Sequence, residues 1–164
     1  MRLPSRHLRD VLKIGELAGE LATTPRTIRL YEELGLIVPE RTAGGTRLYR
    51  KKDVKRLAVV LRLARLGLDL GTLQRLAQTR EQCRSGAEAV DRVLPLIGEL
   101  RAWIGSAAQE LEALERDAER AEGLIRQCSA CPNRPNRKDC PCCPVDKNVD
   151  SADIARLIWD PASP

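Results

Sequence analysis

Hydrophobic positions in the first quarter of the chain recur at helical spacing between turn residues. Ile14, Leu17, Ala18 and Leu21 predict a first short helix. The run 23–25 (Thr-Thr-Pro) then offers a capping hydroxyl followed by a proline, which the first turn of a helix tolerates. A second helix is therefore predicted over residues 25–33, ending before a glycine. Two short helices joined by a tight turn form a helix-turn-helix pattern.

The pattern changes to extended runs beyond the second helix. Residues 36–39 and 47–49 are short extended runs on either side of a turn that contains Gly44 and Gly45, which predicts a β-hairpin. A hairpin placed after a helix-turn-helix is a wing. A further amphipathic helix is expected to open at Asp53 and to break at Gly67, and a short helix over 72–78 closes the head near residue 80.

A long heptad pattern begins after a capping box at Ser85 and Glu88. Its apolar positions are spaced by three and four residues over roughly five heptads, which is typical of a coiled coil. We expect an antiparallel homodimer, with packing of the seam onto the head as the alternative. Pro95 either kinks this helix or marks its true start. The seam comprises Ala87, Val90, Leu94, Ile97, Leu100, Ile104, Ala107, Leu111, Leu114, Ala118, Ala121 and Ile125.

Composition favours an elongated helical protein. Charged residues make up 31% of the 164 residues, and phenylalanine is absent, so a large single core would be thin. The predicted fold class is mainly α: a winged helix-turn-helix head, a dimerisation helix and a cysteine-rich loop. The expected divisions are a basic leader (1–12), the DNA-binding head (13–80), the dimerisation helix (84–127) and an effector-binding segment (128–164).

Charge is distributed unevenly along the chain. Residues 1–84 carry 18 Lys and Arg against 9 Asp and Glu, whereas residues 85–164 carry 10 against 14. A basic first half suggests a polyanionic partner, with a solvated basic surface as the alternative. The polar start and the lack of a long uncharged run predict a cytoplasmic protein with no membrane partner, in which thiols stay reduced.

Cysteines dominate the end of the chain, where five of the six lie within 16 residues. Cys128 and Cys131 form a CxxC pair, and Cys140 and Cys142 form a CxC pair with Cys143 beside it. Such thiolates select soft ions: Hg, Cd, Pb, Zn, Cu(I) or an iron–sulfur cluster. An enzyme is not expected, because the single histidine stands in the leader and the CxxC lacks a thioredoxin-like setting.

Several motifs in order resemble the head of MerR-family regulators. They are IGELA (14–18), TIRLYEELGL (27–36), PERTAGGTRLY (39–49), DVKRL (53–57) and LG (66–67). The likeness covers roughly residues 13–78. Leu30 departs from it, since the family usually has an aromatic residue there, and Thr46 stands where Tyr or His is common.

The resemblance implies a dimeric transcription activator that binds promoter DNA and distorts it so that RNA polymerase can use the promoter. Contacts from the recognition helix and wing would neutralise phosphates and read bases. For the two tyrosines the alternative is a place in the core. By position, the resemblance assigns DNA contacts to Arg26, Thr27, Arg29, Tyr31, Arg41, Thr46, Arg47 and Tyr49.

Three interpretations of the cysteines stay open. The first is a metal sensor that uses Cys128, Cys131, Cys140 and Cys142, with Cys143 as a spare ligand. Cys83 is a further possible ligand, because family members also use a cysteine at the start of the partner's dimer helix. The second is a SoxR-like redox sensor with a [2Fe–2S] cluster. The third is a structural zinc knot in a regulator whose effector is unknown.

Overall fold

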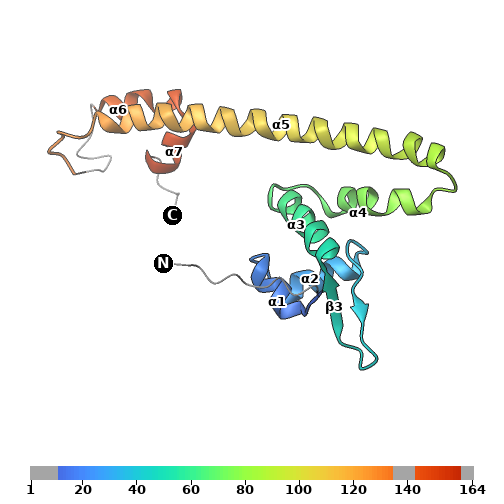
Figure 1. Ribbon diagram of the computed structural model, residues 1–164. Helices are drawn as coiled ribbons and strands as arrows, with labels where there is room; N and C mark the ends of the chain where they lie inside the picture. The colour runs from blue at the N-terminus through green and yellow to red at the C-terminus, as the bar shows by residue number, and fades with distance from the viewer. Residues whose placement is uncertain (1–10, 135–142, 160–164) are drawn as a thin grey trace, which may run out of the picture. The chain divides into compact units, whose positions relative to one another are not determined.

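The computed structural model describes residues 11–134 and 143–159, and it is mainly helical with one small sheet (Figure 1). Two compact units divide between Gly98 and Glu99, inside the longest helix. The first unit contains the winged head, and the second contains the end of the long helix with the C-terminal tail. Across the described ranges, no helix combines the length and apolarity needed to cross a membrane.

The helix-turn-helix consists of α1 (Ile14–Glu20) and α2 (Pro25–Glu33), as expected. Thr24 caps α2: its hydroxyl accepts a hydrogen bond from the Thr27 N–H at 3.1 Å. The turn passes through Ala22, whose φ of 47° lies in the left-handed region. Arg65 from a later helix donates to the Leu21 and Ala22 carbonyls at 3.0 and 2.8 Å, which fixes that turn.

The sheet has three strands in the order β1 (Val11–Leu12), β3 (Arg47–Arg50), β2 (Glu40–Arg41), all antiparallel. The wing is confirmed, but its first strand begins later than the predicted run 36–39. Leu36 and Ile37 are buried in the core instead, and a proline at 39 cannot donate to a ladder. The strand β1 lies in the segment expected as a leader.

Two capped helices complete the head. Asp53 accepts a hydrogen bond from the Arg50 N–H at 2.7 Å near the start of α3 (Lys51–Arg65). Asp69 caps α4 (Leu70–Gln78), which continues into a 3-10 turn, η1 (Thr79–Gln82). Between the helices Gly67 has φ +93°, which glycine adopts without strain. The largest fully buried side chains of the head are those of Leu17, Ile28, Leu36, Ile37, Tyr49 and Leu57.

The long helix α5 runs unbroken from Gly86 to Arg126, so Pro95 does not mark its start. The predicted cap is present, since the Glu88 N–H donates to Ser85 Oγ at 3.2 Å. The Glu88 carboxylate accepts from the Arg84 N–H rather than from Ser85. Most of the predicted seam is exposed within the chain; its large exposed members are Val90, Leu94, Ile97, Ile104, Leu111 and Leu114.

In the second unit, the tail folds onto the last turns of α5 (Figure 1). It contains α6 (Pro144–Asn148), η2 (Val149–Ser151) and α7 (Asp153–Trp159). The tail therefore docks against α5 through the short helices α6 and α7. A small core joins Ala121, Leu124, Val145, Ala152 and Ala155. The tail thus covers the last part of the predicted seam, including Ala121.

Candidate DNA-recognition surface and cysteine site

The inner face of α2 is fixed by burial, which turns its cationic residues outward. Ile28 and Tyr31 are 0% and 6% exposed and pack into the head. Arg26 and Arg29 lie on the exposed side, and the half-buried Thr27 shares a hydroxyl hydrogen bond of 2.9 Å with Thr24. The two arginines therefore occupy a surface that a polyanion can reach, whereas Tyr31 belongs to the core.

The tip of the wing presents Arg41 and Thr46, which are both exposed. The Thr42 N–H donates to the Thr46 carbonyl at 3.0 Å, and the Thr46 N–H donates back to Thr42 Oγ1 at 3.1 Å. Gly45 has φ +78° in this turn, a conformation that favours glycine. The turn is closed by its own hydrogen bonds, which leaves the side chains of Arg41 and Thr46 available to a partner.

Glu32 joins the recognition helix to the wing. Arg47 Nε donates to Glu32 Oε2 at 2.7 Å, and the Tyr49 hydroxyl donates to Glu32 Oε1. Burial, followed by the hydrogen bond to Glu32, raises the pKa of Tyr49, and the same carboxylate raises the pKa of Arg47. Tyr49 is 0% exposed, so its place is the core, while Arg47 is partly exposed.

Sequence reasoning missed Glu32, although it stands among the quoted motif residues. A glutamate on a recognition helix opposes phosphate binding, which is a signal that it serves an internal partner. Glu40 is used in a similar way, because its two carboxylate oxygens pair with Arg50 Nε and Nη2, both at 2.8 Å. Glu40 thus stabilises the hairpin, whereas Glu32 of α2 holds the hairpin against the recognition helix.

Two cysteines of the second unit meet. The Cys128 thiol hydrogen-bonds Cys143, and both pack against the small core formed by α5 and the tail. The backbone N–H of Asp146 lowers the pKa of the Cys143 thiol against the opposing effect of burial; the Val145 N–H and Cys128 lower it further. Among the described cysteines, Cys143, expected as a spare ligand, therefore lies beside Cys128.

Of the other cysteines predicted as ligands near the C-terminus, the structure describes only Cys131. Cys131 is exposed one turn beyond Cys128, with its N–H donating to the Cys128 carbonyl at 3.0 Å. Cys140 and Cys142 lie outside the described residues. Within residues 11–134 and 143–159, no three candidate metal-binding side chains gather at one point. The described part of the site is thus a two-thiol core with a third thiol close in sequence.

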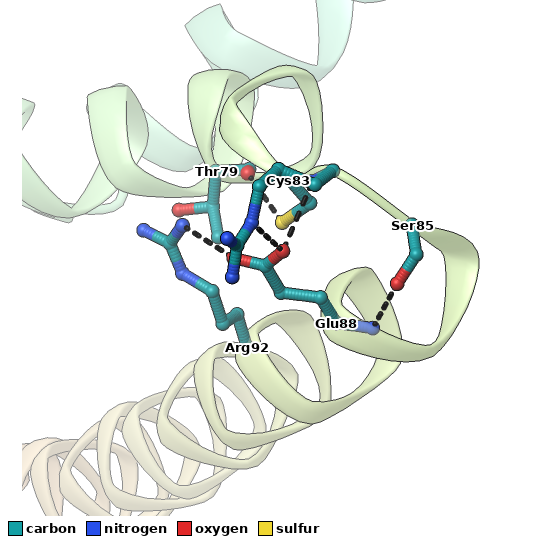
Figure 2. Close-up of polar contacts among 6 residues, drawn as sticks. Thr79, Cys83, Ser85, Glu88 and Arg92 are labelled. Carbon is teal, nitrogen blue, oxygen red and sulfur yellow. Dashed lines mark hydrogen bonds and ion pairs between the residues drawn. The ribbon is translucent and has the colours of Figure 1, made fainter.

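Cys83 belongs to the first unit and lies just before α5 (Figure 2). Its Sγ donates to the Thr79 carbonyl at 3.1 Å, and the neighbouring Glu88 carboxylate pairs with Arg84 at 3.3 Å and Arg92 at 3.8 Å. The thiol is partly buried and is used locally to close the 3-10 turn. This contact gives Cys83 a structural role, and its use as a metal ligand stays a prediction.

Asp117 was also missed by the sequence reasoning, and it anchors α7. It is 6% exposed, and its carboxylate accepts the N–H groups of Asp153 at 3.1 Å and Ile154 at 2.6 Å. Arg120 bridges the same carboxylate and the Ser151 carbonyl at 2.9 and 3.0 Å. The hydrogen bond from Ile154 lowers the pKa of Asp117 most. One residue of α5 therefore holds the first turn of a helix some 36 positions later.

The head geometry defines a winged helix-turn-helix protein of the DNA-binding type. The family model "MerR HTH family regulatory protein" matches residues 12–80. The chain is 32% identical over 131 residues to the transcriptional regulator HmrR of Rhizobium leguminosarum bv. viciae, covering 79% of this chain and 93% of that protein. This chain therefore belongs to the MerR family, whose relatives are named as transcriptional regulators rather than enzymes.

Two other comparisons extend this result. The mercuric resistance operon regulatory protein of Bacillus cereus is 45% identical over 65 residues, 39% of this chain and 49% of that protein. The match to a Haemophilus influenzae ZntR homologue covers 62% of its length, so the chain spans about half to three-fifths of these relatives. HiNmlR, described as a MerR family regulator bound to promoter DNA, shares the fold with a TM-score of 0.54 at 20% identity, covering 74% of this chain and 94% of that one.

Proposed function

We propose that this protein is a dimeric transcription regulator that binds promoter DNA through its winged head and responds to a soft metal ion through its C-terminal cysteines. The observation that carries the first part is the outward-facing cationic set on α2 and the wing, within a head of the MerR family. Arg26 and Arg29 would approach the groove, while Arg41 and Thr46 would reach the neighbouring backbone. Thr27 and Arg47 would support these contacts.

Tyr31 and Tyr49 contribute to DNA binding indirectly, by holding the recognition helix and the wing in place. Both rings are buried, so they orient the surface rather than touch DNA. Tyr49 shares Glu32 with Arg47, so the same carboxylate that holds the wing also restrains a cation close to the recognition helix. A rigid arrangement of this kind reduces the ordering cost of DNA binding.

Dimerisation would use the exposed apolar face of α5. Leu111 and Leu114 are 59% and 47% exposed, and Leu94 is 63% exposed. Leucines repeated at heptad spacing along a solvated helix favour pairing with a second copy, because pairing removes them from water. An antiparallel homodimer would place two heads on two half-sites of one promoter. Distortion of the DNA between them, read by RNA polymerase, is the proposed mode of activation.

The effector proposal rests on Cys128 and Cys143. Two thiols in contact are suited to a thiophilic ion, which binds them as thiolates and releases their protons. Cys131 is the next candidate ligand, followed by Cys140, Cys142 and Cys83. The relative that regulates mercuric resistance agrees with an ion from the group Hg, Cd, Pb, Zn and Cu(I). Those residues fit such an ion by their donor chemistry.

A structural zinc knot is the second candidate, because Cys128 and Cys143 pack against the core that holds the tail. Metal content and colour of anaerobically purified protein test the proposals together. A colourless protein that takes up one of the five ions, with uptake lost in Cys128→Ser and Cys143→Ser, agrees with the metal proposal. Iron and sulfide in a brown protein would replace it with the cluster.

The DNA part is tested separately by binding titrations on duplexes that the wild-type chain enriches from a random-sequence pool. Arg29→Ala is expected to weaken binding by about 1–3 kcal/mol, since an exposed arginine on the recognition helix supplies phosphate or base contacts. Arg134→Ala, in the second unit, is the matched control and should bind as the wild type does. Equal affinity of Arg29→Ala and wild type would remove this assignment.

A further inference from the structure

The loop that follows the recognition helix is held by side chains from two other helices. At the end of α2 the Gly35 N–H donates to the Glu32 carbonyl and the Leu36 N–H to the Tyr31 carbonyl, both at 2.9 Å. These bonds close the helix end and leave the Leu34 carbonyl for another donor. Gln74 Nε2 and Gln78 Nε2 both donate to it, each at 3.0 Å.

Gly35 allows this arrangement. Its φ is +69°, and a Cβ at this position would lie 2.6 Å from Gln78 Nε2. Any larger residue would displace the amide from the Leu34 carbonyl in addition to straining the backbone. The glycine therefore serves two needs at once: a left-handed helix end and room for the glutamine.

A third donor ties the same loop to the end of α4. Arg56 from α3 donates through Nε to the Leu36 carbonyl at 2.8 Å and through Nη2 to the Ala77 carbonyl at 3.1 Å. The loop carbonyls move with the end of α2, and the donors move with α3 and α4. Packing of Leu36 alone would allow the helix to rotate or slide, because apolar contact is not directional. Hydrogen bonds from two sides remove that freedom.

We propose that Gln74 and Gln78 are positioning residues for sequence recognition: through the Leu34 carbonyl they fix the angle at which α2 presents Arg26 and Arg29 to DNA. This inference rests on the proposed DNA-binding function. Both glutamines also line an open cleft of about 740 Å³ between α4, η1 and the first turns of α5, which Asp91 and Leu96 of α5 line as well. The hydrogen bonds from Gln74 and Gln78 to the Leu34 carbonyl therefore lie beside the start of α5.

The test separates positioning from simple stabilisation. Gln74→Leu, Gln78→Leu and the double variant keep side-chain volume and remove the amide donors. Gln82→Leu is the matched control, since Gln82 lines the same cleft one turn further along. Each protein is titrated at one salt concentration on a duplex enriched by the wild type and on a random duplex, and its thermal unfolding is measured.

The double variant is expected to lose about tenfold in affinity for the enriched duplex while its affinity for random DNA stays within about twofold of the wild type. Base readout depends on the angle of the helix, whereas attraction to phosphates does not. An unfolded fraction lowers both affinities equally, so the ratio between the two duplexes reports positioning alone.

An unchanged ratio in the double variant would overturn the inference, as would an equal change in Gln82→Leu. Failure of the wild type to enrich any sequence would instead overturn the proposed function and, with it, the inference.

Discussion

The head and the tail hold their folds in different ways. The head buries large side chains such as Leu17, Ile28 and Leu57 completely. Polar contacts such as the Arg47–Glu32 ion pair then fix how the elements around that core are oriented. Among its described residues, the tail buries only Val145, Ala152 and Ala155 against α5, and these smaller side chains remove less surface from water. Its helix α7 instead depends on the Asp117 carboxylate.

This difference separates two tasks. A head with a deep apolar core keeps its recognition surface when contacts elsewhere change. A tail with a thin core and a few directional contacts can be rearranged at small cost, because little apolar area has to be exposed. The thiols Cys128 and Cys143 pack against that thin core. An ion that moves them would therefore act on the unit whose packing is disrupted at the lower free-energy cost.

The largest effect is expected from Leu57→Ala in the head. Leu57 is fully buried, so its truncation should lower the free energy of unfolding by about 2–5 kcal/mol. Val59→Ala on the same helix is the control, since Val59 is 57% exposed and should cost little. Urea denaturation followed by circular dichroism measures both. Similar losses in the two variants would mean that the head does not depend on this core.

Asp117→Ala should release α7 while the head stays folded. The variant leaves the first N–H groups of α7 without their acceptor, so hydrogen exchange over residues 153–159 should accelerate by at least about tenfold. Exchange over residues 14–33 should be unchanged. Glu119→Ala, at an exposed position of the same helix, is the control. Protection of residues 153–159 at the wild-type level would show that the alanine core alone holds the tail.

Tyr49→Phe should cost the head about 1–2 kcal/mol, because it removes a buried hydrogen bond to a carboxylate while preserving the ring. Tyr31→Phe is the comparison: that ring is also buried but belongs to the inner face of α2. Chemical denaturation compares the two losses. A larger loss in Tyr31→Phe would indicate that Glu32 does not contribute through Tyr49.

The smallest effect is expected from a change of pH near neutrality on the stability of the tail. The pKa of Asp117 is lowered in the folded chain, chiefly by the Ile154 N–H. The stabilisation is therefore fully present above the unfolded pKa of about 4 and is lost as pH falls through the lower folded value. The protection factors of residues 153–159, which compare their exchange with that of an unfolded chain at the same pH, should be constant between pH 7 and 5. They should fall, as α7 is released, only in more acidic buffer. The Asp117→Asn variant should lack this acid transition.

The parts of the fold that follow from the sequence are those fixed by local signals. The hydroxyl and proline at 24–25, the helical spacing after Ser85 and the Gly44-Gly45 turn are each signals between residues close in sequence, so the helices and the hairpin they predict are present. Pairing of the long helix in a coiled coil stays a prediction. The strand at 11–12 could not be predicted, because two residues carry no periodicity. The place of Leu36 in the core also depends on packing rather than on its own pattern.

The candidate site follows the same rule. Outward arginines could be predicted from helical spacing, whereas Glu32 and Asp117 act on partners 15 to 37 residues away that only the folded chain brings close. The choice of Cys143 beside Cys128 is of this kind, since it depends on how α6 returns to α5. Spacing alone predicts Cys140 and Cys142 as ligands with Cys143 as a spare, and Cys140 and Cys142 lie outside the described residues.

The central claim is that DNA binding and effector response occupy different parts of the chain, and Cys128→Ser tests it most directly. The measurement is induction of a reporter that carries the enriched duplex, with Hg, Cd, Pb, Zn or Cu(I) added, alongside the affinity of the purified variant for that duplex. We predict that the wild type responds to at least one ion, and that Cys128→Ser keeps its affinity within about twofold and loses induction. Retained induction, or loss of affinity and induction together, would contradict the claim.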